Sequence, residues 1–170
     1  GVFKSERVVV AAGAWSAQLS GTVGLDLPVI PVRGQMLLFK TPPGLLQHII
    51  LQDGYYLIPR QDGLVCAGST LEYVGFDKET SLEARDLLTE HACGLVPGLS
   101  ECEIVRQWAG LRPGTREGIP FIGQHPDIRG FYMNTGHFRN GVVMAPASVQ
   151  LLLDIMLERD SFTDPGYYKL

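Results

Sequence analysis

Cysteine is scarce in this sequence, and its spacing excludes the usual structural uses of the thiol. The three cysteines among 170 residues are Cys66, Cys93 and Cys102, an odd number without any C-x-x-C pair. Zinc sites and disulfide frameworks need cysteines that are paired in number or closely spaced. We therefore expect neither a metal site nor a disulfide, and interpret the cysteines as reduced core residues of a cytoplasmic protein.

Runs of positive charge and long apolar stretches are also missing. The net charge is -4, and no cluster of Lys or Arg offers the basic surface that nucleic acids bind. The longest apolar run, from Val149 to Leu157, is interrupted by Gln150 and Asp154 and falls well short of the ~20 residues needed to cross a bilayer. We expect no nucleic-acid partner and no membrane span.

Apolar residues are nevertheless abundant enough for a folded core. They make up 45% of the sequence, against 19% charged residues, which fits an ordinary soluble domain. Arg7 to Ala12 is a continuous, β-branched run ending at Gly13, which is typical of a strand buried on both faces. A short helix is expected after it, from Ala14 to Ser20.

The middle of the chain predicts an antiparallel sheet with one helix. Strands are expected at 29–40, 49–51, 55–59, 64–67 and 103–111, separated or ended by turns that contain glycine or proline. Thr80 to Glu83 resembles a capping box, and apolar residues follow at helical spacing from Ala84 to Leu95. One amphipathic helix should pack on this sheet.

The last part of the chain predicts a strand, a loop and a helix. The strand is expected at 131–134, the glycine-bounded loop at 136–141 and the helix from about Val143 to Arg159, with Pro146 near its start. The expected apolar stripe of this helix consists of Val149, Leu152, Leu153 and Met156. Taken with the preceding segments, this pattern predicts the α+β fold class.

Two segments combine arginine with aromatic residues where a simple core would use aliphatic side chains. They are residues 107–115 (QWAGLRPGT) and 136–141 (GHFRNG). Both end or interrupt an element, where binding sites are often built. The alternative makes Arg112 a surface ion-pair partner and the second segment a flexible loop, since isolated arginines are mostly exposed. The local pattern leaves both interpretations open.

Five motifs in a fixed order resemble the D-amino-acid oxidase superfamily of FAD-dependent enzymes, and most of all its bacterial glycine oxidases. They are residues 8–16 (VVVAAGAWS), 31–35 (PVRGQ), 56–60 (YLIPR), 108–115 (WAGLRPGT) and 136–141 (GHFRNG). The resemblance extends from Val8 to about Glu158, and several motifs in register are more specific than any one alone.

These enzymes share an amino-terminal G-x-G-x-x-G turn that binds the FAD pyrophosphate, and this sequence contains no such motif. We therefore expect the chain to be the carboxyl-terminal part of a longer protein, with an amino-terminal FAD-binding segment as its missing partner. The chain by itself is expected to bind no FAD and to be inactive.

The resemblance implies that three side chains bind a small amino-acid substrate. Arg112 would clamp the substrate carboxylate, Arg139 would lie near it, and Tyr56 would hydrogen-bond the substrate or line its cavity. Arginine suits this role because its planar, permanently charged guanidinium can hold a carboxylate at two points. For Tyr56 the alternative is a sheet aromatic packed in the core.

The resemblance also implies contacts with the flavin of FAD. Backbone N–H groups and the positive helix end at 136–143 would stabilise negative charge on the reduced ring. The residues implied in cofactor binding are Gly13, Gly136, His137, Phe138, Arg139, Asn140, Gly141, Val142 and Val143. No catalytic side chain is assigned, because the flavin carries the chemistry and the protein orients the substrate.

The implied architecture is an antiparallel or mixed substrate-binding sheet with flanking helices, plus terminal remnants of a Rossmann-like FAD domain. Residues 1–27 would be the last strand and helix of the FAD-binding domain, 28–112 the substrate-binding domain, and 113–170 a return to the FAD-binding domain. The implied activity is oxidation of the primary or secondary amine of an amino acid to an imine, by hydride transfer to flavin with formation of peroxide. Resemblance to glycine oxidases also suggests a link to thiamine biosynthesis.

Two positions depart from the glycine oxidase pattern and keep alternatives open. Leu71 stands where those enzymes have a methionine beside the substrate, and Gly54 replaces a histidine near the entrance. A D-amino-acid dehydrogenase or a sarcosine-type oxidase is therefore an alternative among enzymes. A free-standing binding module without catalysis is the alternative from another class. Each of these could form a homo-oligomer.

Overall fold

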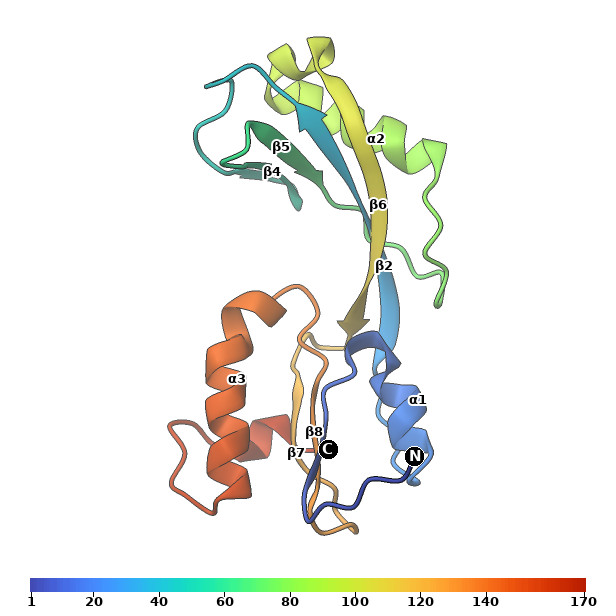
Figure 1. Ribbon diagram of the computed structural model, residues 1–170, viewed down its shortest axis with the longest axis vertical. Coiled ribbons are helices and arrows are strands. Elements are labelled where there is room, and N and C mark those ends of the chain that lie inside the picture. The colour runs from blue at the N-terminus through green and yellow to red at the C-terminus, as the bar shows by residue number, and fades with distance from the viewer. The chain divides into compact units, whose positions relative to one another are not determined.

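The computed structural model describes residues 1–170 and divides into two compact units. Unit 1 comprises Gly1–Pro31 and Arg112–Leu170, and unit 2 comprises Val32–Leu111. The strands β2 (Ile30–Lys40) and β6 (Glu103–Gly114) carry the chain from one unit into the other (Figure 1). Helices and sheets occur in both units, so the predicted α+β class is confirmed. No helix combines the length and the apolar character that a membrane crossing requires.

Unit 2 is built on a sheet whose hairpin turns are set by glycine. β3 (Ile50–Gln52), β4 (Tyr55–Pro59) and β5 (Leu64–Gly68) join β2 and β6 in the order β3-β4-β5-β2-β6. The turn between β3 and β4 holds Asp53 at φ 50° and Gly54 at φ 84°, the left-handed backbone of a tight hairpin. The strands predicted at 29–40, 49–51, 55–59 and 64–67 all form, each within one residue of its predicted ends.

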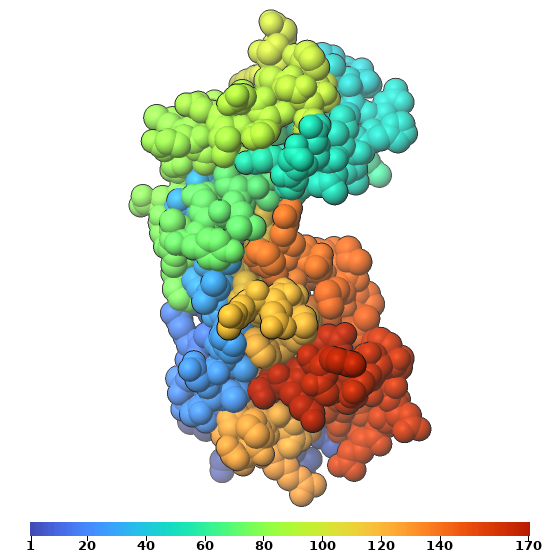
Figure 2. All heavy atoms as spheres, turned by 180° about the vertical axis from the view of Figure 1, so that it is seen from behind, coloured from blue at the N-terminus to red at the C-terminus, as the bar shows by residue number.

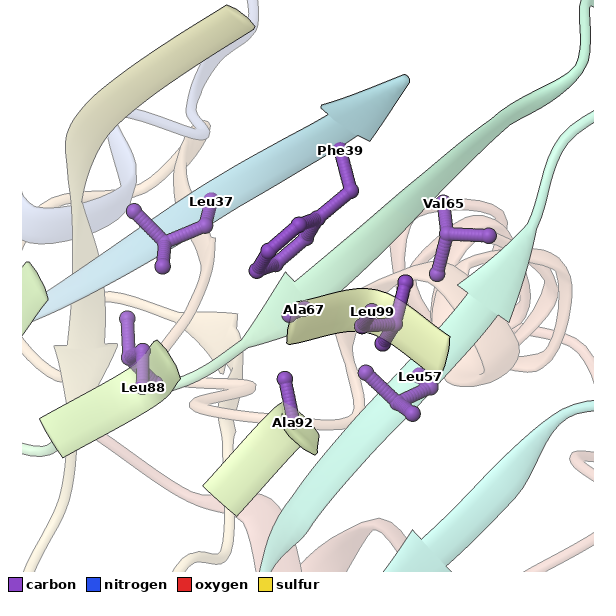
Figure 3. Packing of buried hydrophobic residues seen from close by; sticks show 8 residues of the cluster. All are labelled: Leu37, Phe39, Leu57, Val65, Ala67, Leu88, Ala92 and Leu99. Carbon is purple, nitrogen blue, oxygen red and sulfur yellow. The ribbon is translucent and has the colours of Figure 1, made fainter. Parts of the chain in front are cut away.

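The core of unit 2 lies between this sheet and the helix α2 (Leu82–Leu95), which is followed by the 3-10 helix η2 (Pro97–Glu101). Figure 3 shows side chains from the strands, α2 and η2 converging on one apolar cluster: Leu37, Phe39, Leu57, Val65, Ala67, Leu88, Ala92 and Leu99. Burial of this apolar surface is the main stabilising contribution in the unit.

The cap of α2 lies one residue later than the predicted capping box. Ser81, not Thr80, is the N-cap, and its hydroxyl oxygen accepts a hydrogen bond from the Ala84 N–H at 3.2 Å. Leu87, predicted on the apolar face, is 39% exposed, whereas Leu88 is buried. The shift arises because both Thr80 and Ser81 can cap a helix, and tertiary contacts of Ser81 select between them.

Unit 1 contains a three-stranded sheet of order β1-β8-β7. β1 (Val8–Val10) pairs in parallel with β8 (Phe131–Thr135), and β7 (Phe121–Gln124) pairs with β8 in antiparallel orientation. The turn η1 (Gly13–Trp15) and the helix α1 (Ser16–Gly21) follow β1, and α3 (Gly141–Met156) follows β8 (Figure 1). A short 3-10 helix, η3 (Pro165–Tyr168), precedes the carboxyl terminus.

The first strand is not buried on both faces as its sequence predicts. Val8 and Val9 are 45% and 42% exposed, and β1 is an edge strand whose neighbour in the sheet is β8. A continuous β-branched run is therefore present without the flanking strand that such a run usually has in a parallel sheet.

The buried face of α3 also differs from the predicted stripe. Leu151 and Leu152 pack against Ile122 of β7 and Tyr132 of β8, whereas Val149 and Leu153 are 51% and 42% exposed. Because apolar residues occupy more than one side of this helix, periodicity alone could not select the buried face. α3 begins at Gly141 rather than Val143, so that Pro146 lies in its second turn.

A buried polar network centred on Arg33 fastens the segment between β5 and α2 to the sheet. The Arg33 guanidinium donates to Glu72 through Nε at 3.0 Å and Nη2 at 2.6 Å, and its Nη1 donates to Asp77 and to the Glu79 carbonyl. Gln35 Nε2 donates to Glu72 at 3.0 Å, and the Thr70 hydroxyl donates to the same carboxylate.

The same network reaches the helix and the outer strand of the sheet. The Gln35 side-chain oxygen accepts from the Ser81 N–H at 3.0 Å and from Gln107 Nε2 of β6 at 3.1 Å. Every charged or amide group of the cluster thus has a partner, which is the condition under which buried polar groups stabilise a fold.

Burial raises the pKa of Glu72, but hydrogen bonds from Thr70, Arg33 and Gln35 outweigh burial, so that the net pKa lies below the ordinary value. A depressed carboxylate pKa adds stability above the unfolded-state pKa, and that stability is lost as the pH falls through the folded-state pKa. We expect Glu72→Gln to lower the free energy of unfolding at neutral pH by about 1–2 kcal/mol, since partial exposure screens the pair. Urea unfolding should show this difference shrinking below the ordinary glutamate pKa of about 4.3.

The matched control is Asp62→Asn, which removes the partner of Arg60 from an ion pair whose side chains are 51% and 47% exposed. Solvent screens that pair, so the unfolding midpoint at neutral pH should hardly change. A loss at Glu72 that stays constant from neutral to acid pH would contradict a charge-based role for the carboxylate.

Candidate functional site

In unit 1 a backbone hydrogen bond joins the two segments that carry arginine. The Phe138 N–H donates to the Pro113 carbonyl at 3.0 Å. Arg112 directly precedes Pro113 at the end of β6, and Arg139 directly follows Phe138 in the loop before α3. Arg112 is half-buried and Arg139 is exposed. The fold thus brings together the two segments that sequence motifs singled out.

Gly136, which opens this loop, is packed where no side chain fits. Its φ is 84°, and a Cβ atom placed on it would lie 2.7 Å from Thr115 Cγ2 and 3.4 Å from Pro120 Cα. Glycine is needed here both for the left-handed backbone and for the close approach. Phe138 is also left-handed, with φ 49°, although it has a side chain. The loop therefore holds a conformation that its surroundings must enforce.

Thr115 borders a surface pocket of unit 1 on its other side. The pocket has a volume of about 270 Å³, and Pro28, Phe121 and Tyr167 are among its lining residues. Figure 2 shows residues 115–120 beside the carboxyl-terminal segment in this region. The Thr115 hydroxyl oxygen is buried without a hydrogen-bond partner. The methyl group of Thr115 is the group that a Cβ atom on Gly136 would overlap.

Two hydroxyl groups connect the motif at residues 8–16 to the start of the loop at Gly136. Ser16 Oγ donates to Thr135 Oγ1 at 2.7 Å, and Thr135 Oγ1 donates to the Gly13 carbonyl at 3.2 Å. Ser16 and Thr135 are both buried, and Thr135 directly precedes Gly136. The turn after β1 is thereby held at the end of β8, where the arginine-bearing loop begins.

The amino-terminal end of α3 completes this region. An α-helix leaves its first N–H groups without an intrahelical partner, and here these belong to Gly141, Val142 and Val143. The N-cap, Asn140, makes no side-chain capping hydrogen bond, and the Val142 and Val143 side chains are 92% and 85% exposed. The positive end of the helix dipole at this point favours an electron-rich group.

His137 lies inside the loop and points to the helix rather than to solvent. Its Nε2 is 2.8 Å from Ser148 Oγ of α3. Burial lowers the pKa of His137 below its usual value. Burial thus favours the neutral form of the imidazole over the charged form.

Tyr56 belongs to unit 2, on the strand β4, opposite Gly68 of β5. Its hydroxyl donates to Met36 Sδ at 3.2 Å, and a Cβ atom on Gly68 would overlap that sulfur at 2.2 Å. Tyr56 is half-buried and is not part of the apolar core, which its neighbour Tyr55 contacts. Tyr56 therefore lies on the face of the sheet opposite the apolar core, and the alternative of a core aromatic fits this position less well.

Sequence motifs did not identify every residue that shapes the region. Thr135 and Ser148 lie outside the motifs, yet one fastens the turn after β1 and the other contacts His137. The one available sequence signal for Ser148 is its position among apolar residues of a predicted helix. A hydroxyl side chain at such a position often makes a hydrogen bond to a neighbouring polar group.

Comparison with known proteins relates the whole arrangement to flavoenzymes. The model of a family described as FAD dependent oxidoreductase matches residues 1–155. A glycine oxidase of Pseudomonas aeruginosa is 49% identical over 168 residues, which make up 99% of this chain and 46% of the relative. A glycine oxidase of Geobacillus kaustophilus is 35% identical over 100% of this chain and 45% of the relative. The chain spans less than half the length of these curated relatives.

Solved structures agree with the sequence comparison. The crystal structure of glycine oxidase from Geobacillus kaustophilus superposes with a TM-score of 0.94 at 35% identity, over 99% of this chain and 46% of that one. Iminodiacetate oxidase from Chelativorans sp. superposes with a TM-score of 0.92 at 26% identity, over 98% of this chain and 46% of that one.

The packing of Gly136 generates a prediction about stability. Gly136→Ala should destabilise the protein by about 2–4 kcal/mol, because it adds a left-handed alanine and an overlap with Thr115 and Pro120. Gly118→Ala is the matched control, since Gly118 has φ 71° in the same unit but open space around its Cβ position. The control should cost only about 1–2 kcal/mol. Equal losses of unfolding free energy in urea would show that the close approach of Gly136 is unimportant.

Proposed function

This chain belongs to the family of FAD dependent oxidoreductases, and we propose that it forms the substrate-facing part of an amino-acid oxidase similar to glycine oxidase. In this proposal the amine of a small amino acid is oxidised to an imine, and oxygen takes up the electrons to give peroxide. In the same proposal, the unit 1 segments before residue 28 and after residue 112 contact FAD. Residues 28–112 contribute the substrate-binding sheet.

One observation carries the proposal, namely the hydrogen bond from the Phe138 N–H to the Pro113 carbonyl. It holds the backbones next to Arg112 and Arg139 side by side. An amino acid offers one carboxylate, and two neighbouring guanidinium groups can bind and orient it through charge-assisted hydrogen bonds. We assign the carboxylate clamp to Arg112 and a supporting role to Arg139, with the Tyr56 hydroxyl as a further substrate contact.

The residues at the start of α3 fit the flavin of FAD. Three N–H groups without intrahelical partners, no side-chain cap and the positive end of a 16-residue helix form a donor set suited to an electron-rich ring edge. In the proposal Gly136–Val143 and Gly13 hold the flavin from this side. Bound FAD supplies the two-electron oxidation, while the side chains of this chain bind and orient the substrate.

Orientation is the main contribution that these residues make to catalysis. A carboxylate fixed at Arg112 limits the ways in which the substrate amine and its adjacent C–H bond can point. The neutral His137 imidazole is already engaged with Ser148, so it is not assigned as a base. The proposed chemistry needs no nucleophile from this chain.

We expect Arg112→Ala, made in the FAD-loaded full-length protein that contains this chain, to lower kcat/KM for D-alanine by roughly thirtyfold to a thousandfold, since a charge-assisted bidentate contact is lost. The loss for ethylamine, which has no carboxylate, should be much smaller. Arg112→Lys should recover only part of the activity, because it keeps the charge and loses the planar fork. Steady-state peroxide formation measures all three, and glycine and sarcosine in the same assay define the preferred amine.

Equal losses for D-alanine and ethylamine would contradict the clamp, because an arginine with a purely structural role affects both substrates alike. A carboxylate-dependent loss in Arg139→Ala but not in Arg112→Ala would move the clamp to Arg139.

A further inference from the structure

The loop Gly136–Asn140, which we call the arginine loop, is held at three separate points. Gly136 packs on Thr115, the Phe138 N–H donates to Pro113, and the His137 ring contacts Ser148. The first two contacts reach towards β6. The third is a side-chain contact between the loop and the body of α3.

Ser148 is well placed to act as a fixed anchor. It is 3% exposed and lies in the middle of α3, next to the leucines that pack this helix on β7 and β8. The Asn140 N–H donates to the His137 carbonyl at 2.9 Å, so the same residue also closes the end of the loop. Through backbone and ring, His137 connects the start of α3 to its core-packed section.

The loop needs such an anchor because its backbone is strained. Phe138 adopts φ 49°, a left-handed conformation that is unfavourable for a residue with a side chain, and Asn140 provides no side-chain cap for the helix. Without an outside contact the segment would gain freedom by relaxing Phe138. Arg139 directly follows Phe138, so relaxation of Phe138 would also displace the Arg139 backbone.

We propose that His137 is a positioning residue that acts through Ser148 to hold Arg139 and the first N–H groups of α3 in their binding geometry. The proposal rests on the proposed function, in which Arg139 supports the substrate carboxylate. In this proposal the His137 imidazole contacts Ser148 of α3 and not the substrate, so that His137 affects substrate binding indirectly. The depressed pKa of His137 agrees with this, because a neutral ring shares one hydrogen bond with a hydroxyl without placing charge in the loop.

A double-mutant cycle in the FAD-loaded full-length protein that contains this chain tests whether His137 acts through Ser148. His137→Ala and Ser148→Ala should each raise KM for D-alanine about five- to tenfold, with a smaller change in kcat and in the KM for ethylamine. The double variant should be no worse than either single variant, because both remove the same contact. His137→Gln, which can still hydrogen-bond Ser148, should recover part of the loss.

Hydrogen exchange gives a second measurement that does not depend on turnover. The N–H groups of Phe138 and Asn140 should exchange faster in both single variants. Gln150→Ala is the matched control, since it removes a 2.8 Å hydrogen bond to Asp154 on the same helix, away from the loop. It should leave exchange in the loop and KM unchanged.

Additive losses in the double variant, or unchanged loop exchange in the single variants, would overturn the positioning role. Arg139→Ala, measured in parallel, separates this outcome from failure of the proposed function. If Arg139→Ala shows a carboxylate-dependent loss and His137→Ala does not, the positioning role is wrong and the function stands. If neither Arg112→Ala nor Arg139→Ala shows such a loss, both proposals fall.

Discussion

The hydrogen bond between the Phe138 N–H and the Pro113 carbonyl is the contact on which the site depends. It joins the end of a long strand to the loop before the last helix, two segments far apart in sequence. In the same loop Gly136 lies against Thr115, where a side chain would overlap, and Phe138 has a left-handed backbone. Two arginine-bearing segments then lie side by side, as binding of a carboxylate requires.

The two units use different polar contacts to hold their functional segments. Unit 1 relies on hydroxyl groups: Ser16 and Thr135 fasten the turn after β1, and Ser148 holds the arginine loop through His137. Unit 2 relies on charge, with Arg33 and Glu72 at the centre of a saturated network. Uncharged anchors suit the proposed role of unit 1, because a further buried charge would alter the electrostatic field at the proposed carboxylate and flavin sites.

Local pattern predicted β2 to β5 to within one residue, since alternation and glycine turns are properties of short segments. The strand predicted at 103–111 continues to Gly114 as β6. Local pattern failed where tertiary contacts decide. The sequence predicts that Val8 and Val9 are buried on both faces of the sheet, but both are partly exposed on an edge strand. In α3, Leu151 is buried and Val149, which was predicted to be buried, is exposed. For the site, the motifs predicted Arg112 and Arg139, whose roles stay a prediction. The motifs also predicted the family, and the comparisons confirm the family. The motifs could not supply Thr135 or Ser148, whose roles arise from contacts between distant parts of the chain.

The central claim is that the Arg112 segment and the arginine loop form one carboxylate site beside the flavin. The most direct measurement is a titration of the FAD-loaded full-length protein that contains this chain with acetate, a carboxylate that cannot be oxidised as an amine, while the flavin absorbance is recorded. Our account predicts a saturable change in the flavin spectrum that is lost in Arg112→Ala and weakened in His137→Ala. A spectrum that acetate leaves unchanged, or the same change with the same affinity in Arg112→Ala, would contradict it.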